Sequence, residues 1–263
     1  MSTATEDALL LRVNKESQVQ ALNELGFTEI TMDTPLSTIA EYMRWAGGLR
    51  DITLATVLKS TNKQHFFTTE EWKALSSTEQ QKYCILGARI RAERQDFIIA
   101  REDCTSSTGS KTFTWGPTDV NVPGLQDYGA ENTGIYDTFN GAENSAVISA
   151  YAASSGKSFP ANAAATSYKA AKQATHGYED PTDWFLPSLG QLMFFYRYRT
   201  EINNFFTAIF NANTYNLTSD WHWSSTEYSA ASAWYVNVSS GTVNHWLSKS
   251  NAIRVRACSA VKN

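Results

Sequence analysis

The clearest pattern of hydrophobic and polar positions lies near the C-terminus, between Ala233 and Ser239. Apolar side chains occupy every second position there, at Trp234, Val236 and Val238. A period of two predicts a half-buried strand whose intervening residues, Tyr235 among them, face outward. Ser240-Gly241 then predicts a turn, and 242–244 a returning strand.

The residues after this hairpin have no such regularity. The run 245–252 mixes aromatic, polar and charged residues without a period, and regular order returns only at 253–257. A regular frame interrupted by positions without a pattern is typical of a binding surface carried on a scaffold. We therefore expect the stretch 221–261 to hold the functional site.

A second informative stretch is 183–192, with the sequence DWFLPSLGQL. Ser188 and Gln191 have the spacing of a capping box, and Pro187 ends the extended approach to the helix that they start. The residues expected on the inner face of this helix are Leu189, Leu192, Phe195 or Tyr196, and Ile202. Residues 204–218 are predicted to be a loop or a short helix.

Helices and strands also occur in the middle of the chain. Thr68 and Glu71 form another capping box, and Ser77 or Thr78 is expected to cap a further helical turn. Strands are predicted over 89–91, 96–100 and 113–115, and helices over 140–154 and 163–174.

The first 62 residues predict a small α/β segment with little core of its own. Ser17 is expected to cap a short helix, Thr34-Pro35 to start a second one, and 51–59 to form a strand. Its apolar faces can be covered by another subunit of an assembly or by the rest of the chain, and the sequence does not choose between these. We therefore divide the chain into an assembly or oligomerisation segment, 1–62, and a ligand-binding domain, 63–263.

Charge and hydropathy narrow the possible partners. The 263 residues carry a formal net charge of −4, whereas nucleic acids and anionic membranes favour a basic patch. No apolar run is long enough to cross a bilayer. The first residues place two acids before a short apolar run, unlike a secretion signal, so we expect synthesis in the cytoplasm.

The chain has three cysteines, which are far apart in sequence. This spacing favours free thiols at Cys84, Cys104 and Cys258, although a bridge between the last two remains possible. Asp119 and nearby acids lack the spacing of a calcium loop. The four histidines show no metal-ligand spacing. We predict no bound metal and no cofactor.

A catalytic site is not expected either. No Ser-His-acid order is present. Glu227 and Asp220 could form a carboxylate pair, but a structural hydrogen bond from Glu227 to the backbone is the favoured interpretation. The prediction is a protein that is not an enzyme.

Two motifs together resemble a known family: WFLPSLGQL before a helix, and WHWSSTEY, AWYVNVSSGTV and IRVRAC at the end of the chain. They are similar to the C-type-lectin-fold proteins of phages and bacteria that retroelements diversify, which include the phage tropism determinant at tail-fibre tips. The resemblance covers roughly residues 64–261. The segment FTTEEWKALSS to ARIRAERQDFIIA also looks like tail-fibre proteins of phages that infect gut Bacteroides-type bacteria.

The resemblance implies an α+β, C-type-lectin-like fold with a twisted antiparallel sheet and flanking helices. Residues that match the family's structural frame include Trp223, Glu227, Trp234, Gly241, Arg254 and Arg256. The positions between them match variable, ligand-binding slots: His222, Tyr228, Ser229, Ala230, Ser232, Tyr235, Asn237, Ser239, Thr242, Asn244, His245, Trp246, Leu247, Lys249, Ser250, Asn251 and Ala252.

Four of these slots are expected to anchor a ligand: Tyr228, Tyr235, His245 and Trp246. Aromatic side chains offer a large contact area with little rotamer entropy to lose, and Ser and Asn add adaptable hydrogen bonds. The alternative for Trp246 is a core position at the base of a loop.

By resemblance, the function is binding of a host-surface ligand, a bacterial protein or glycan, at a phage tail-fibre tip. A homotrimer attached to tail-fibre or baseplate components is expected, located in the virion after synthesis in the host cytoplasm. One alternative is a bacterial cell-surface adhesin or pilus-tip module of the same fold. Another is an oxidase of the formylglycine-generating kind, which would need a paired or copper-bound cysteine near Cys258.

Overall fold

The computed structural model describes residues 15–20, 23, 31–35, 51–92, 95–127, 129, 138–168, 182–217 and 220–261. The chain divides into two compact units, one formed by 1–51 with 90–96 and the other by 52–89 with 97–263. In the first unit, residues 15–20 are helical, so Ser17 lies inside a helix and not at its start. The helix predicted after Thr34-Pro35 lies outside the described residues.

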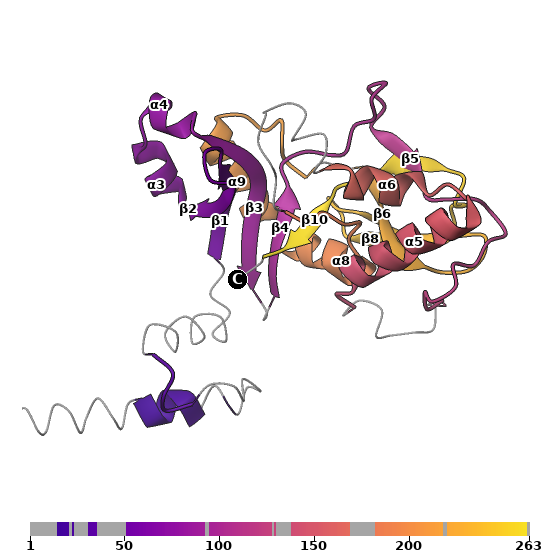
Figure 1. Cartoon of the computed structure of the whole chain (residues 1–263), viewed down its shortest axis with the longest axis horizontal. Helices are drawn as coiled ribbons and strands as arrows, with labels where there is room; N and C mark the ends of the chain where they lie inside the picture. The colour runs from indigo at the N-terminus through magenta and orange to yellow at the C-terminus, as the bar shows by residue number, and fades with distance from the viewer. Residues whose placement is uncertain are drawn as a thin grey trace, which may run out of the picture. The chain divides into compact units, whose positions relative to one another are not determined.

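Two five-stranded sheets and several helices make this a mixed α+β protein. The first sheet has the order β10-β4-β3-β1-β2 (Figure 1). Its strands are β1 (Asp51–Leu58), β2 (Lys63–Phe67), β3 (Tyr83–Ala92), β4 (Gln95–Ala100) and β10 (Cys258–Ala260). β1 and β2 form an antiparallel hairpin with Leu54 opposite Phe67, so the boundary predicted at residue 62 falls inside a hairpin.

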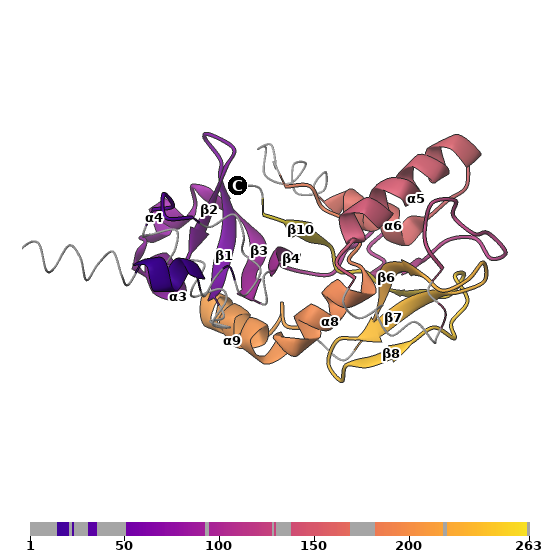
Figure 2. The ribbon, with the colours of Figure 1, turned by 90° about the horizontal axis from the view of Figure 1, so that it is seen from below.

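The second sheet carries the C-terminal stretch and has the order β5-β9-β6-β7-β8. Its strands are β5 (Thr112–Thr114), β6 (Trp221–Glu227), β7 (Ala233–Asn237), β8 (Thr242–Asn244) and β9 (Ala252–Arg254). β6, β7 and β8 run antiparallel and lie side by side in Figure 2. β9 pairs with β6 in parallel, with His222 opposite Arg254. The predicted hairpin after Ala233 is therefore confirmed.

Some of the helices begin where the sequence places their caps, whereas α6 begins three residues before the predicted helix 163–174. They are α3 (Thr69–Ala74), α4 (Ser77–Gln80), α5 (Gly141–Ser155), α6 (Pro160–Thr166), α8 (Leu189–Arg197) and α9 (Arg199–Phe210). The capping boxes of Thr68 with Glu71 and of Ser188 with Gln191 are confirmed. Ser76 caps α4, one residue before the predicted position. Over 204–218, where a loop or a short helix is predicted, α9 continues to Phe210, and bends and turns follow over 211–216.

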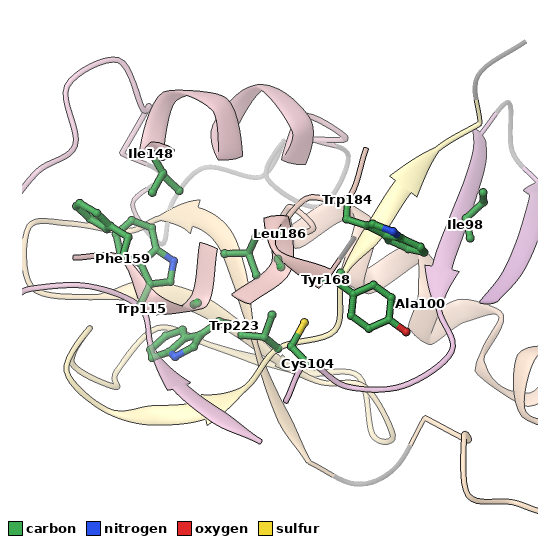
Figure 3. Close-up of a cluster of buried hydrophobic side chains, with 14 of the residues drawn as sticks. Ile98, Ala100, Cys104, Trp115, Ile148, Phe159, Tyr168, Trp184, Leu186 and Trp223 are labelled. Atoms are coloured by element: carbon green, nitrogen blue, oxygen red, sulfur yellow. The ribbon is translucent and has the colours of Figure 1, made fainter. Parts of the chain in front are cut away.

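A hydrophobic core joins α5 and α6 to the second sheet. Figure 3 shows Trp115, Phe159, Leu186 and Trp223 within this cluster. The Trp115 indole N–H donates to the Ser224 carbonyl at 2.8 Å, and the Trp223 indole N–H donates to the Phe113 carbonyl at 2.9 Å. Because buried indole donors find backbone acceptors, both large side chains are buried without leaving a polar group unpaired.

Candidate functional site

The centre of the candidate site is β7, which lies between β6 and β8 and is buried on both faces. Trp234, Tyr235 and Val236 are all buried. The Tyr235 ring centroid lies 5.1 Å from that of Trp221 and 5.5 Å from that of Trp223. The prediction that Tyr235 faces outward and anchors a ligand is therefore wrong. The period of two identified the strand correctly, but an inner strand covered on both sides buries its alternate residues as well.

The opposite face of β7 supports a set of aromatic rings that we call the aromatic stack: Tyr228, His245 and Trp246. Trp234 lies beneath it, in edge-on contact with Tyr228 and His245. The Tyr228 and His245 rings are nearly parallel, with centroids 3.9 Å apart. Trp246 stands edge-on to His245, and 81% of its surface is exposed. The alternative that Trp246 is a core residue is excluded.

Hydrogen bonds hold the backbone beneath this stack. The side-chain oxygen of Asn244 accepts from the N–H groups of His245 at 2.7 Å and of Trp246 at 3.1 Å. Burial raises the pKa of the Tyr235 hydroxyl, against the opposing effect of hydrogen bonds with the backbone of Leu247 and Trp246. Tyr235 is thus a buried side chain, where the sequence assigned it a ligand contact.

Partial burial lowers the pKa of His245 below its ordinary value, opposed by a backbone hydrogen bond. Its imidazole is therefore uncharged at neutral pH. A neutral ring stacks on Tyr228 without the cost of desolvating a cation.

Lys249 fixes the run 245–252 from within and has no exposed surface. Its ammonium pairs with the Glu227 carboxylate, donates to the Val120 carbonyl at 2.7 Å and lies 4.7 Å from the Trp115 ring centroid. Glu227 also accepts from the Val122 N–H at 3.2 Å, which confirms the expected backbone hydrogen bond. Lys249 was predicted as a ligand-binding position, and that is wrong because a ligand cannot reach it.

His222 is the third predicted binding position that the structure buries, with 1% of its surface exposed. Its Nε2 lies 3.2 Å from Asp103 Oδ1, and its Nδ1 lies 3.0 Å from the Asp220 carbonyl oxygen. The assignment of His222 to a binding slot is therefore wrong. A histidine near the start of a buried strand signals an internal partner, but the sequence does not show which residue that is.

The partner is Asp103, which the sequence did not single out. Besides His222, it accepts hydrogen bonds from Arg254 and Arg256, each at 3.2 Å. Burial acts to raise the pKa of Asp103, but the His222 hydrogen bond and the Arg256 charge outweigh it and hold that pKa well below its usual range. Arg256 also donates to the carbonyls of Ala100, Arg101 and Tyr215. This cluster ties the segment after β4 to the C-terminal strands.

The other predicted positions reach the surface to differing degrees. Five are exposed: Thr242, Trp246, Ser250, Asn251 and Ala252. Nine are partly exposed: Tyr228, Ser229, Ala230, Ser232, Asn237, Ser239, Asn244, His245 and Leu247. Of the predicted frame, Trp223, Glu227, Trp234 and Arg256 are buried, while Gly241 and Arg254 are partly exposed.

Gly241 fits the hairpin turn between β7 and β8 for two reasons. Its φ of +72° lies in the left-handed region, which side chains other than glycine rarely adopt. A Cβ atom built there would lie 2.3 Å from the Tyr196 ring. The turn therefore packs directly on α8, and only glycine permits that approach.

The three cysteines are free and buried, as predicted. Burial raises the pKa of the Cys104 thiol to about 12 and that of Cys258 well above its ordinary value. Both groups are therefore protonated thiols at neutral pH, a poor state for a nucleophile or a copper ligand.

Among the described residues, no group of three or more His, Cys, Asp or Glu side chains has the arrangement of a metal site. Within the same residues, no helix combines the length and hydrophobicity needed to cross a membrane.

No protein-family model matches the chain, and no curated protein matches it either. Among solved structures, the chain is similar to a fimbrial protein from Bacteroides ovatus, with 17% sequence identity and a TM-score of 0.47. The similarity covers 63% of this chain and 36% of the fimbrial protein, so the chain spans well under half the length of that protein.

Proposed function

We propose that this chain is a receptor-binding protein that holds a ligand of a bacterial cell surface with the loop 245–252 and the neighbouring turn 228–232. The observation that carries the proposal is Trp246, which is 81% exposed at the edge of the aromatic stack. An aromatic side chain on an anchored backbone is a typical binding hot spot, because it loses little conformational entropy on contact.

The buried frame beneath the loop supports this proposal. Lys249 fixes the loop from within through Glu227 and Val120, and Asn244 fixes its start. The surface residues on either side of Lys249 can change without disturbing the core. A buried frame that carries exchangeable surface residues suits the C-type lectin fold of retroelement-diversified proteins. We assign the chain to this fold on its sequence motifs.

The chain then acts as a homotrimer at a phage tail-fibre tip, where several copies of a weak site produce useful avidity. It binds its ligand without catalysis. The raised pKa values of Cys104 and Cys258 support this part of the proposal, because an oxidase of the formylglycine-generating kind needs a reactive thiolate near the C-terminus.

The test is adsorption of the purified full chain to a panel of intact gut Bacteroides strains, measured by flow cytometry. We expect saturable binding to some strains, and at least about tenfold weaker binding by Trp246→Ala, the loss of about 1.4 kcal/mol. Absence of binding across the panel would overturn the proposal. Sequencing the 3′ end of the gene in sibling isolates tests diversification: substitutions should gather at the exposed positions and spare His222, Tyr235 and Lys249.

A further inference from the structure

The exposed apolar surface near Trp246 is small. Of the described residues, Met32 and Trp246 are the large hydrophobic side chains that are exposed, and Met32 belongs to the other compact unit. One aromatic side chain buries roughly 150–250 Å², whereas a stable protein interface needs about 800 Å² from each partner. The fully exposed apolar face is therefore about the size of one ring, and the same turn and loop also carry the partly exposed Tyr228, His245 and Leu247.

The predicted binding positions that accompany Trp246 carry little charge. Of the seventeen predicted binding positions, the one with a permanent charge is Lys249, which is buried and paired with Glu227. His245 has a lowered pKa and is neutral. These positions offer no charge of their own to complement an acidic polysaccharide or a charged peptide. Lys157, which lines a shallow pocket together with Ser250, is a cation outside them.

Serine hydroxyl groups lie in the turn and in the loop that carry the aromatic stack. Ser232 and Ser248 form a β-bridge that brings the turn 228–232 against the loop 245–252. The hydroxyls of Ser229 and Ser232 lie 3.2 Å apart, and those of Ser248 and Ser250 lie 2.9 Å apart. Each hydroxyl can both donate and accept, so each pair keeps the capacity to bond a further hydroxyl.

From these three observations we infer that the ligand is an uncharged glycan, with one sugar ring stacked on the exposed face of Trp246 and its hydroxyls bonded by the serines of the adjoining turn and loop. This inference rests on the proposed receptor-binding function and names the ligand class for the same site. The apolar C–H face of a pyranose matches an indole in size, and its hydroxyl rim matches the serine pairs. The contacts contain no carboxylate, so binding requires no bridging cation.

The first experiment uses the strains that bind the full chain. Cells are treated either with periodate, which cleaves vicinal diols of sugars, or with proteinase K, which removes exposed proteins. We expect binding to fall at least tenfold after periodate and to persist after proteinase K. The reverse result would identify a protein ligand and overturn this inference, while the proposed receptor-binding function would stand.

The second experiment measures binding to immobilised neutral and acidic oligosaccharides with variants of the full chain. Trp246→Ala should lose binding to neutral oligosaccharides, and Trp246→Phe, which keeps an aromatic face, should retain part of it. Thr112→Ala removes an exposed side chain of β5, at the other edge of the same sheet and outside the predicted binding positions. It serves as the matched control, with unchanged binding expected.

Three outcomes would contradict the glycan assignment. One is binding confined to acidic oligosaccharides. Another is binding that EDTA abolishes at an unchanged melting temperature. The third is a Trp246→Ala variant that dissociates into monomers by light scattering, because Trp246 would then cover a second copy of the chain and not a sugar.

Discussion

The ammonium group of Lys249 is buried against the carboxylate of Glu227, and this pair joins the irregular C-terminal loop to the end of β6. Neither side chain has exposed surface. Burial raises the pKa of Glu227 and lowers that of Lys249, while their mutual hydrogen bond opposes both changes. Two costly charges are thus held together at the base of the presented surface, where they anchor the loop.

The first prediction concerns this pair. Lys249→Met should lower the free energy of unfolding by about 3–5 kcal/mol, because it leaves Glu227 buried without a partner. Urea denaturation measures the change. The double variant Glu227→Leu with Lys249→Met should lose less than the single variant, because neither charge remains. A double variant that is as unstable as the sum of both single variants would contradict a coupled pair.

The same variant has a predictable pH dependence. In Lys249→Met the raised pKa of Glu227 should rise further, because the opposing effect of the lysine is gone. A carboxyl group with a raised folded-state pKa stabilises the folded state below its unfolded pKa and loses that contribution as pH increases through the folded value. The loss in free energy of unfolding caused by Lys249→Met should therefore be smaller at pH 5 than at pH 8.

Asp103 should give stability the opposite dependence on pH. Its pKa is held well below the ordinary value, so its stabilisation is fully present above the unfolded aspartate pKa of about 3.9 and is lost as pH falls toward the folded value. Asp103→Asn should cost about 3 kcal/mol at pH 7, since Arg256 and His222 lose a buried partner. The difference from the unmodified chain should shrink between pH 4 and pH 2 in thermal melts. A difference independent of pH would contradict this assignment.

Much of the fold is predictable from local sequence. The capping boxes of Thr68 and Ser188 depend on residues three positions apart, and the turn at Gly241 depends on one glycine, so a short window contains the cause of each feature. The period of two around Trp234 likewise identified β7. The cysteines were interpreted correctly because their spacing alone argues against a metal or disulfide motif.

The errors share a different cause. Tyr235, His222 and Lys249 were assigned to the surface because they stand between frame residues or carry polar groups. Their burial depends on partners far away in sequence: Tyr235 packs against Trp223 from the neighbouring strand, His222 bonds Asp103, and Lys249 bonds Val120. A single sequence shows the strand but not what covers its second face.

Tyr235 and Trp246 make a matched test of this correction, since both were predicted to anchor a ligand. Tyr235→Ala should lower the free energy of unfolding by about 3–5 kcal/mol, the usual cost of removing a buried aromatic ring. Trp246→Ala should change it by no more than about 0.5 kcal/mol, because the side chain is exposed. Equal losses for the two variants would show that Trp246 is packed in the protein.

The buried thiols predict slow chemical modification. Cys104 and Cys258 are buried and have raised pKa values. A thiol reagent such as DTNB should therefore react with them only as the chain unfolds. In 6 M guanidinium all three cysteines of the chain should react. Fast labelling of Cys258 in the native protein would instead favour a reactive site of the oxidase kind.

Gly241 and Gly156 allow two effects of replacing a glycine, backbone strain and steric clash, to be measured separately. Both have left-handed backbones, with φ of +72° and +70°, but a Cβ at Gly241 would collide with Tyr196, whereas nothing lies within 4 Å of one at Gly156. Gly156→Ala should cost about 1–2 kcal/mol from backbone strain alone. Gly241→Ala adds a steric clash and should cost roughly 1–3 kcal/mol more.

The clash can be tested through its partner. In a Tyr196→Ala background, Gly241→Ala should cost only what Gly156→Ala costs, because the colliding ring is absent and the backbone strain remains. Urea denaturation of the four variants of this cycle measures the coupling. An unchanged cost of Gly241→Ala without Tyr196 would mean that the hairpin turn is not packed on α8.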